Sequence, residues 1–298
     1  MKWIRPFCLC LLLPATGSAQ THKLHVLASF LPLYAHCKQV AGDAAEVDIL
    51  LGRDTSPHDY EFKPGDLQKL TWADVFVMNG VGLEDWLGDL ISRSGSKSLA
   101  VVDSSRGVEL LDNPRVMALQ AGKSGDAEGG HNPHIWLDPV NALQQVRNIR
   151  DALATADPAH AETYRRNAER YLGELQKLDA DYRDTLGSLS GCNLVTFHDA
   201  FPYLARRYHL HDLGCIEEFP EKEPRPQDLR RLIGLIQKNH VKVLFAENGY
   251  APKLLEEIAR QSGAGVVEID TLEVGNPEAD AYLVRMRRNL AVLQKVWQ

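Results

Sequence analysis

Three histidines and one aspartate stand at positions in the sequence where metal ligands are common. His58 lies in the segment after the apolar run "VDILL", His134 follows a glycine-rich loop, His198 directly follows "LVTF", and Asp270 follows "VVEI". Imidazole nitrogen and carboxylate oxygen are ligands that Zn²⁺ accepts in a tetrahedral shell of four. The sequence therefore contains the donors of a zinc site, provided that the fold brings these four residues together.

The elements that must position these residues alternate between strand and helix patterns, which indicates βαβ units and a parallel sheet. We predict an α/β fold with two similar lobes, each built on a mainly parallel four-stranded sheet flanked by helices. The expected strands span residues 23–30, 45–51, 74–80 and 98–105, then 192–199, 211–219, 241–250 and 264–272. The expected helices between and after them span residues 30–42, 63–73, 82–94, 200–210, 224–240, 251–263 and 278–297.

A long polar segment separates the two series of strands. Residues 138–156 predict a helix with Asp138 as N-cap and Pro139 in its first turn. Residues 157–189 then predict a single charged helix with one apolar stripe, which suits a rigid link between the lobes. The predicted organisation is a signal peptide at 1–19, an N-terminal lobe at 20–156, a linking helix at 157–189 and a C-terminal lobe at 190–298.

The first residues of the chain predict export. Basic residues precede the apolar run 7–13, and small residues follow at 17–19, as in a secretory signal peptide cut after Ala19. The run is too short to span a bilayer as a helix, so we expect a soluble protein of the periplasm. Of the five cysteines, Cys37, Cys192 and Cys215 lie beyond this cleavage site. A disulfide between Cys192 and Cys215 and a free pair are both compatible with the sequence.

The composition is that of an ordinary globular protein, with 44% hydrophobic and 24% charged residues. The formal net charge of −7 argues mildly against a nucleic acid as partner and would not repel a cation. Two lobes joined by one helix leave a cleft, and parallel sheets bind ligands at the carboxyl ends of their strands. His58, His134, His198 and Asp270 are all expected at such ends, so we predict that they meet in the cleft.

The sequence resembles a known family, the metal-binding solute receptors of ABC importers in the zinc/manganese cluster. The resemblance covers nearly the whole chain after residue 19, and the stretches "SPHDYEF", "NPHIWLDP", "LVTFHDAF" and "FAENGYAPKLLEEIARQSGAGVVEID" carry it. It implies two α/β lobes with a rigid linking helix, and a metal ion that is held between the lobes and passed to a membrane permease. The family's ligands fall on His58, His134, His198 and Asp270.

The resemblance also bears on which metal is carried. Manganese receptors resemble this pattern with a glutamate at the third ligand position, whereas zinc receptors have a histidine, as His198 is here. Imidazole also suits Zn²⁺ better than Mn²⁺. The prediction is thus a high-affinity periplasmic zinc receptor, a monomer that is not an enzyme, whose partners are Zn²⁺ and an ABC permease. Whether a periplasmic metallochaperone loads the metal stays open.

The same donor residues are compatible with two alternatives to a zinc receptor. One is a receptor of the same family for manganese or another divalent metal, since Cu²⁺ and Ni²⁺ also compete for imidazole sites. The other is an exported zinc hydrolase, which would need three protein ligands and an open position for water. A fourth protein ligand, Asp270, closes that position, and the chain has no His-Glu-x-x-His pattern.

The sequence also predicts roles for several residues near the four candidate ligands. Glu247 is expected to accept a hydrogen bond from a ligating imidazole, Asp199 to cap the next helix, and Trp136 to pack in the core. His131 lies in a short glycine-rich segment, 121–132, and is expected to be a solvated histidine. These are predictions from local context alone.

Overall fold

The computed structural model describes residues 23–58, 60–88, 91, 98–112, 130–189, 191–217, 226–247 and 252–297. The predicted signal peptide at 1–19 and most of the glycine-rich segment 121–132 lie outside the described residues. No helix within the described ranges is both long and apolar enough to cross a membrane.

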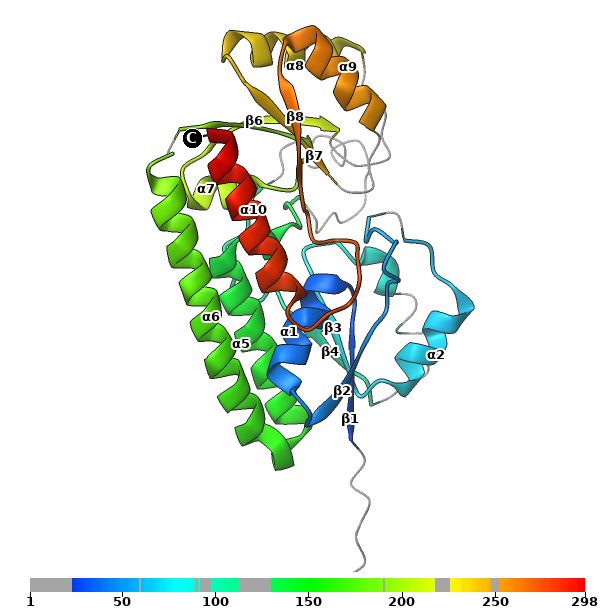
Figure 1. Cartoon of the computed structure of the whole chain (residues 1–298). Helices are drawn as coiled ribbons and strands as arrows, with labels where there is room; N and C mark the ends of the chain where they lie inside the picture. The colour runs from blue at the N-terminus through cyan, green and yellow to red at the C-terminus, as the bar shows by residue number, and fades with distance from the viewer. Residues whose placement is uncertain are drawn as a thin grey trace, which may run out of the picture.

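Two four-stranded sheets form the framework, and every strand pair in both is parallel. The first sheet contains β1 (Leu24–Ala28), β2 (Ala45–Ile49), β3 (Val75–Met78) and β4 (Ala100–Asp103), in the order β2-β1-β3-β4. The second contains β5 (Asn193–His198), β6 (His211–Glu217), β7 (Val243–Glu247) and β8 (Gly265–Ile269), in the equivalent order β6-β5-β7-β8. The predicted fold, two similar α/β lobes, is confirmed (Figure 1).

Helices cover the sheets. Those of the first half are α1 (Leu31–Ala41), α2 (Pro64–Trp72) and α5 (Pro139–Ala156), with the short 3-10 helices η1 (Asp85–Leu87) and η2 (Ile135–Leu137). Those of the second half are α7 (Pro202–Arg207), α8 (Pro226–Lys238), α9 (Pro252–Ser262) and α10 (Ala281–Trp297). The helix predicted over 82–94 is described only in part, and η1 lies within it. Asp138 caps α5 as predicted, because its side chain accepts a hydrogen bond from the backbone N–H of Val140.

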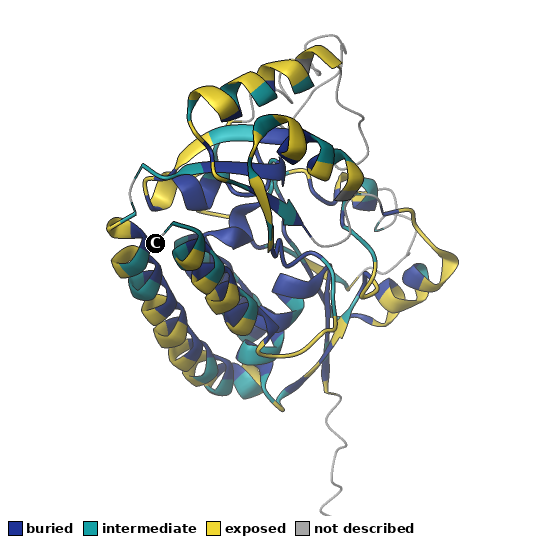
Figure 2. Ribbon diagram, turned by 45° about the horizontal axis from the view of Figure 1, so that its top comes forward, coloured by how far each residue is buried: buried dark blue, intermediate teal, exposed yellow. Residues whose placement is uncertain are grey.

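Alternate residues of the strands face different helical layers, as the two-residue period of a strand requires. On β3, Val75 and Val77 pack in the core shared with α1, α5 and α6, whereas Phe76 points to the α2 side. In the second sheet, Val195 and Phe197 of β5 pack in the core under α8 and α9. Figure 2 shows the result, with buried central strands between helices whose outer faces are exposed.

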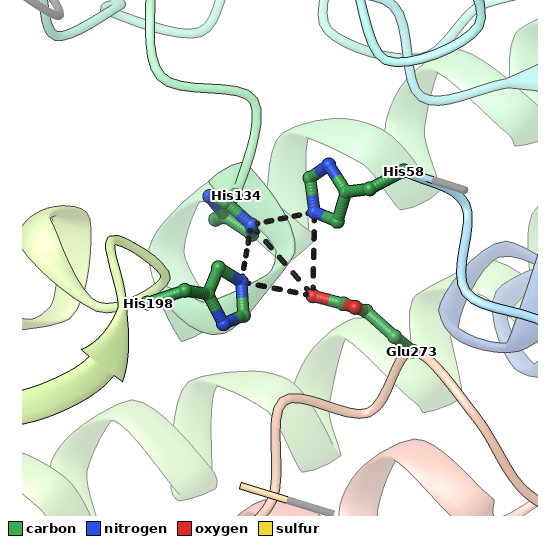
Figure 3. A group of neighbouring side chains, drawn as sticks. All are labelled: His58, His134, His198 and Glu273. Carbon is green, nitrogen blue, oxygen red and sulfur yellow. Dashed lines mark hydrogen bonds and ion pairs between the residues drawn. The ribbon is translucent and has the colours of Figure 1, made fainter. Parts of the chain in front are cut away.

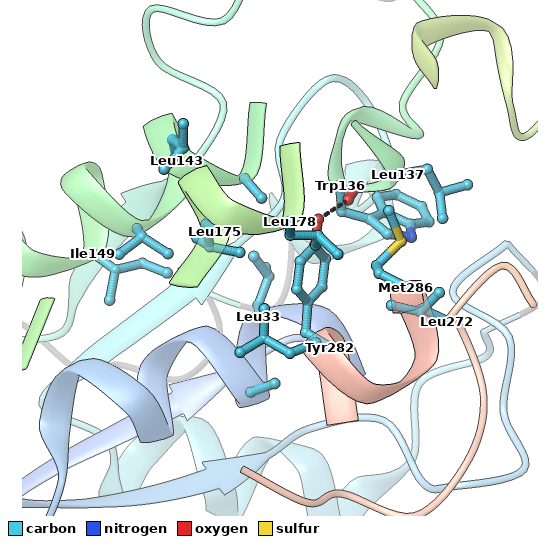
Figure 4. Packing of buried hydrophobic residues seen from close by; sticks show 14 of the residues in the cluster. Leu33, Trp136, Leu137, Leu143, Ile149, Leu175, Leu178, Leu272, Tyr282 and Met286 are labelled. Atoms are coloured by element: carbon cyan, nitrogen blue, oxygen red, sulfur yellow. Dashed lines mark hydrogen bonds between the residues drawn. The ribbon is translucent and has the colours of Figure 1, made fainter. Parts of the chain in front are cut away.

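The long linking element is a 3-10 turn, η3 (Pro158–His160), followed by α6 (Ala161–Gly187). The predicted apolar stripe is buried along one face, with Leu175, Leu178 and Tyr182 fully inaccessible. Burying a leucine side chain contributes about 1.5–3 kcal/mol. This face packs against α5, α1 and α10 rather than standing alone between the lobes (Figure 4).

Helix α10 follows the last strand of the second sheet and packs back against α1 and α6. Two hydrogen bonds strengthen this return: the Tyr282 hydroxyl donates to the Trp136 carbonyl at 2.7 Å, and the Tyr182 hydroxyl donates to the Met286 carbonyl at 2.7 Å. As a result one continuous apolar core joins both halves of the chain. The lobes are restrained by this whole helical layer, not only by α6.

A buried histidine in this layer makes stability depend on pH. His36 on α1 is fully buried, and its Nδ1 lies 3.0 Å from the Tyr171 hydroxyl. Burial lowers the pKa of His36 to about 3. In the unfolded chain an imidazole takes up a proton below about pH 6.5. Stability from this residue is therefore present above about pH 6.5 and is lost as pH falls toward 3.

We expect His36→Gln to flatten the acid dependence of folding. In the zinc-free parent, His36 should contribute a loss of up to about 1.4 kcal/mol per pH unit below pH 6.5. Urea unfolding at several pH values between 7 and 4 measures this slope for parent and variant. His211→Gln, which changes an exposed histidine, is the control and should keep the parent's slope. Identical slopes in all three proteins would contradict the assignment.

Candidate metal site

Four side chains from four separate segments meet between the two sheets. His58 lies in the loop after β2, His134 immediately precedes η2, His198 is the last residue of β5, and Glu273 lies in the loop after β8. Figure 3 shows all four pointing toward one another. Two come from the first half of the chain and two from the second, so the group exists only while the halves are joined.

The distances within this group match a tetrahedral metal shell. The Nε2 atom of His134 lies 3.0 Å from the Nε2 atoms of both His58 and His198. Glu273 Oε1 lies 3.6 Å from His58, 3.7 Å from His134 and 3.4 Å from His198, measured to Nε2. Metal bonds of about 2.0–2.1 Å in a tetrahedron place the ligand atoms roughly 3.3 Å apart. One ion therefore fits among the four atoms with small adjustments.

The four side chains are almost completely shielded from solvent. The side chains of His134, His198 and Glu273 are exposed by 5%, 1% and 1%, whereas that of His58 is exposed by 11%. The more open side is therefore the loop that carries His58. An ion bound here would exchange with solvent past this loop.

The order of the strands in the two sheets explains why the four side chains gather here. In both sheets the strand order reverses beside the first strand, between β1 and β3 and between β5 and β7. Open α/β sheets bind ligands at this point, beyond the carboxyl ends of the strands. His198 ends β5 and Glu247 ends the neighbouring β7, so the two side chains meet across the reversal.

Glu247 holds the His198 ring in place. Its carboxylate accepts a hydrogen bond from the His198 backbone N–H at 3.1 Å and a second one from Nδ1 of the ring. With Nδ1 engaged, Nε2 is the nitrogen that faces the centre of the site. This bears out the supporting role predicted for Glu247, a carboxylate that orients a ligating imidazole.

The electrostatics of the site favour a cation. Burial lowers the pKa of His134 well below its usual value, and the imidazoles of His198 and His58 lower it further. Burial also opposes the charged form of His198, but Glu247 and Glu273 outweigh it and raise its pKa to about 10. Burial likewise opposes ionisation of Glu273, yet His58 and His198 hold its pKa well below the usual value. An ionised carboxylate and three imidazoles thus surround one point.

The fourth ligand expected from the sequence, Asp270, lies outside this group. One of its carboxylate oxygens accepts a hydrogen bond from the Leu272 N–H at 2.8 Å, and the other lies 3.5 Å from an Arg285 nitrogen. The side-chain amide of Asn289 on α10 pairs with the backbone N–H and C=O of Asp270. Asp270 is therefore built into the turn after β8, and Glu273 takes the place among the imidazoles that was predicted for it.

The shape of the turn after β8 explains why Glu273, and not Asp270, faces the imidazoles. Leu272 has φ of 64°, in the left-handed region that non-glycine residues seldom adopt, so the chain reverses there. The reversal points the carboxylate of Glu273 inward. "DTLEVG" contains both carboxylates, and the only signal for Glu273 was its presence in the same loop. Which carboxylate faces the site depends on Asn289 and Arg285, far along the chain.

The loops that carry His58 and Glu273 are tied together. The Gly275 N–H donates to the Arg53 carbonyl at 2.6 Å, and the Ser56 hydroxyl donates to Glu273 Oε2 at 3.3 Å. Gly275 has φ of 132°, and a Cβ there would collide with the Arg285 guanidinium. Glycine is thus required at the point where the two loops meet.

The other local predictions had mixed outcomes. Trp136 is fully buried and donates from Nε1 to the Thr271 carbonyl at 2.8 Å, so its packing role is confirmed. Asp199 does not cap α7, whose N-cap is Phe201; its carbonyl and carboxylate accept from Asn132 instead. His131 is half-exposed and lies 3.0 Å from Asp112. Cys37, Cys192 and Cys215, which all lie in the described part of the chain, form no disulfide with one another.

Comparison with known proteins places the chain in a family. A family model described as the zinc-uptake complex component A, periplasmic, matches residues 26–296. The chain belongs to this family. The class predicted from the sequence, the metal-binding solute receptors of ABC importers, is confirmed at this level.

Individual relatives are consistent with this family assignment. The high-affinity zinc uptake system protein ZnuA of Bacillus subtilis is 31% identical over 309 residues, covering 98% of this chain and 97% of that protein. The zinc-binding lipoprotein AdcA of Streptococcus pneumoniae is 31% identical over 281 residues, covering 92% of this chain and 56% of AdcA. The chain thus spans a little over half the length of AdcA.

Solved structures share the whole fold. FpvC of Pseudomonas aeruginosa in complex with Mn²⁺ superposes with a TM-score of 0.82 at 29% identity, covering 93% of this chain and 99% of FpvC. A zinc-bound deletion mutant of ZnuA gives 0.79 at 27% identity, covering 93% and 99% of the two chains. The laminin-binding protein Lmb of Streptococcus agalactiae, described as an adhesin with metal-transporting activity, gives 0.81 at 30% identity, covering 92% and 100%.

Asp270 and Glu273, both in the loop after β8, should differ sharply on substitution. We expect Glu273→Ala to weaken zinc binding by more than about 100-fold, beyond the 10–100-fold typical of an outer partner of a metal ligand. Asp270→Asn keeps an oxygen that can accept from the Leu272 N–H, so we expect less than about a tenfold change. Zinc titration against a competing chelator measures both. Equal losses in the two variants would return Asp270 to the set of ligands.

Proposed function

We propose that the protein captures one Zn²⁺ ion outside the cytoplasm and delivers it to the membrane permease of an ABC importer. The observation that carries the proposal is the convergence of three imidazole nitrogens and one carboxylate oxygen within 4.8 Å of one another. Zinc is the cargo of this site, and His58, His134, His198 and Glu273 are its proposed ligands. Family membership supports the transport role.

The donor set supports zinc over manganese. Three imidazoles and one carboxylate in a small tetrahedral shell suit Zn²⁺, whereas Mn²⁺ favours oxygen ligands and a larger coordination number. A receptor for another divalent metal stays an alternative for one specific reason: similar structures of FpvC hold Mn²⁺ and Ni²⁺. Direct competition between metals separates the two.

The same donor set argues against catalysis. A catalytic zinc keeps a position open for water, and it needs a general base beside that water. Here a fourth protein ligand fills the shell, and the buried carboxylate nearest to it, Glu247, is already hydrogen-bonded to His198. We therefore propose a binding protein without hydrolase activity.

The proposed mode of action needs only one copy of the chain. All four ligands come from a single chain, so a monomer can bind the ion completely. Capture and delivery outside the cytoplasm agree with the periplasmic family and with the export signal expected at residues 1–19. A metallochaperone could supply the ion, but the site needs no second protein to complete its shell.

Metal competition tests the proposal. We expect the purified chain to bind one zinc ion and to retain it when a tenfold excess of Mn²⁺ is added, because the imidazoles prefer zinc. Elemental analysis after gel filtration gives the stoichiometry. Retention of manganese in preference to zinc would favour a receptor for another divalent metal. A stoichiometry near two zinc ions per chain would contradict a single site.

Metal release should involve the two tied loops rather than opening of the lobes. The common core of α1, α5, α6 and α10 resists rotation of one sheet against the other. Residues 52–58 and 270–275, by contrast, are loops that carry His58 and Glu273, and the hydrogen bond from the Gly275 N–H to the Arg53 carbonyl ties them to each other. We expect zinc to slow hydrogen exchange in both loops together and to leave the strands and α6 nearly unchanged. A large change spread over both sheets would show that the lobes move as bodies.

A further inference from the structure

Asn132 uses every polar atom it has, and its contacts reach both halves of the chain. The residue is buried, with only 2% of its surface exposed. Its backbone N–H donates to the Leu111 carbonyl at 2.9 Å, and its carbonyl accepts from the Tyr203 hydroxyl at 2.7 Å. Its side chain contacts His134 on one side and Asp199 on the other. No role in the site was assigned to it from the sequence.

The orientation of this side-chain amide follows from its backbone partners. The His134 backbone N–H can only donate, and it lies 3.0 Å from Asn132 Oδ1. The Asp199 carbonyl can only accept, and it lies 2.7 Å from Asn132 Nδ2. The oxygen must therefore face His134 and the nitrogen must face Asp199. The same nitrogen lies 3.3 Å from Asp199 Oδ2.

This orientation selects one tautomer of His134. Nδ1 of the ring lies 3.0 Å from Asn132 Oδ1, an atom that accepts hydrogen bonds and cannot donate them. A neutral imidazole carries one proton, which must then sit on Nδ1. Nε2 is left with its lone pair, and Nε2 is the atom that faces His58, His198 and Glu273.

The other end of the amide fixes the second half of the site. Asp199 directly follows His198, so the bond from Asn132 Nδ2 to the Asp199 carbonyl holds the turn at the end of β5. The side-chain amide of Asn132 thus bonds to the backbone at His134, from the first half of the chain, and to the backbone beside His198, from the second half. Their Nε2 atoms lie 3.0 Å apart.

We propose that Asn132 is a positioning residue for metal capture: its oxygen sets His134 in the metal-binding tautomer, and its nitrogen fixes the turn after His198 at the matching distance. The proposal rests on the proposed function, since it assigns a task within the same site. It predicts that loss of the amide affects both the protonation pattern of one ring and the affinity for the ion.

Three variants separate these effects. Asn132→Ala removes both contacts. Asn132→Asp keeps an oxygen acceptor beside His134 but places a second oxygen against the Asp199 carbonyl. Asn148→Ala is the matched control, because the Asn148 amide also donates to two backbone carbonyls, those of Ser104 and Arg106, and is hydrogen-bonded to none of the four site residues.

The first measurement is the tautomer of His134 in zinc-free protein, read from two-bond nitrogen–proton spectra of ¹⁵N-labelled histidine. The parent, Asn132→Asp and Asn148→Ala should show a proton on Nδ1 and none on Nε2, whereas Asn132→Ala should show both tautomers. A parent ring protonated on Nε2 alone would overturn the proposal. This readout needs no bound zinc, so it decides the claim even if the proposed function fails, and the parent spectrum decides it even if a variant does not fold.

The second measurement is zinc affinity by chelator competition. Asn132→Ala should bind zinc about 10–100-fold more weakly than the parent, the range found when an outer partner of a metal ligand is removed. Asn148→Ala should bind as tightly as the parent, although both variants lose stability. Unchanged zinc affinity in a folded Asn132→Ala protein would overturn the positioning role. Failure of the parent to bind zinc would instead reject the proposed function.

Discussion

Three imidazole nitrogens and one carboxylate oxygen, the donor atoms of the candidate metal site, are packed together at the boundary between two sheets. The Nε2 atoms of His58 and His198 lie 3.0 Å from that of His134, and the carboxylate of Glu273 closes the group. Burying an ionised carboxylate is costly unless a positive charge offsets it. The rest of the structure depends on this constraint, because each element must deliver its ligand to the same point and hold it there.

The two parallel sheets with equivalent strand order provide that delivery. In each sheet the strand order reverses beside the first strand, between β1 and β3 or between β5 and β7. Polar side chains from the two sheets therefore meet in one place. Behind the ligands, buried polar groups fix the rings: Glu247 holds His198 and Asn132 holds His134. The helical layer of α1, α5, α6 and α10 forms one core across both halves, which keeps the two pairs of ligands at a constant separation. Rigidity in that layer leaves the loops as the moving parts.

Local sequence patterns predicted the fold and three of the four site residues, and they failed where distant contacts decide. Alternating strand and helix periods located both sheets, and the apolar stripe of 157–189 located the helix that became α6. The three histidines were recognisable because each sits where a strand ends or a helix begins. Glu273, the fourth member of the candidate site, was not recognisable, since the choice between it and Asp270 depends on the left-handed backbone of Leu272 and on Asn289 from α10. The polar contacts of Asp199 were missed for the same reason.

Anomalous diffraction from zinc-loaded crystals, recorded on both sides of the zinc absorption edge, tests the central claim most directly. The account predicts a single strong peak about 2.0–2.2 Å from the Nε2 atoms of His58, His134 and His198 and from one oxygen of Glu273. A peak bonded to Asp270, with Glu273 turned away, would contradict the assignment of the fourth ligand. A peak only on exposed histidines such as His131 would contradict the site as a whole.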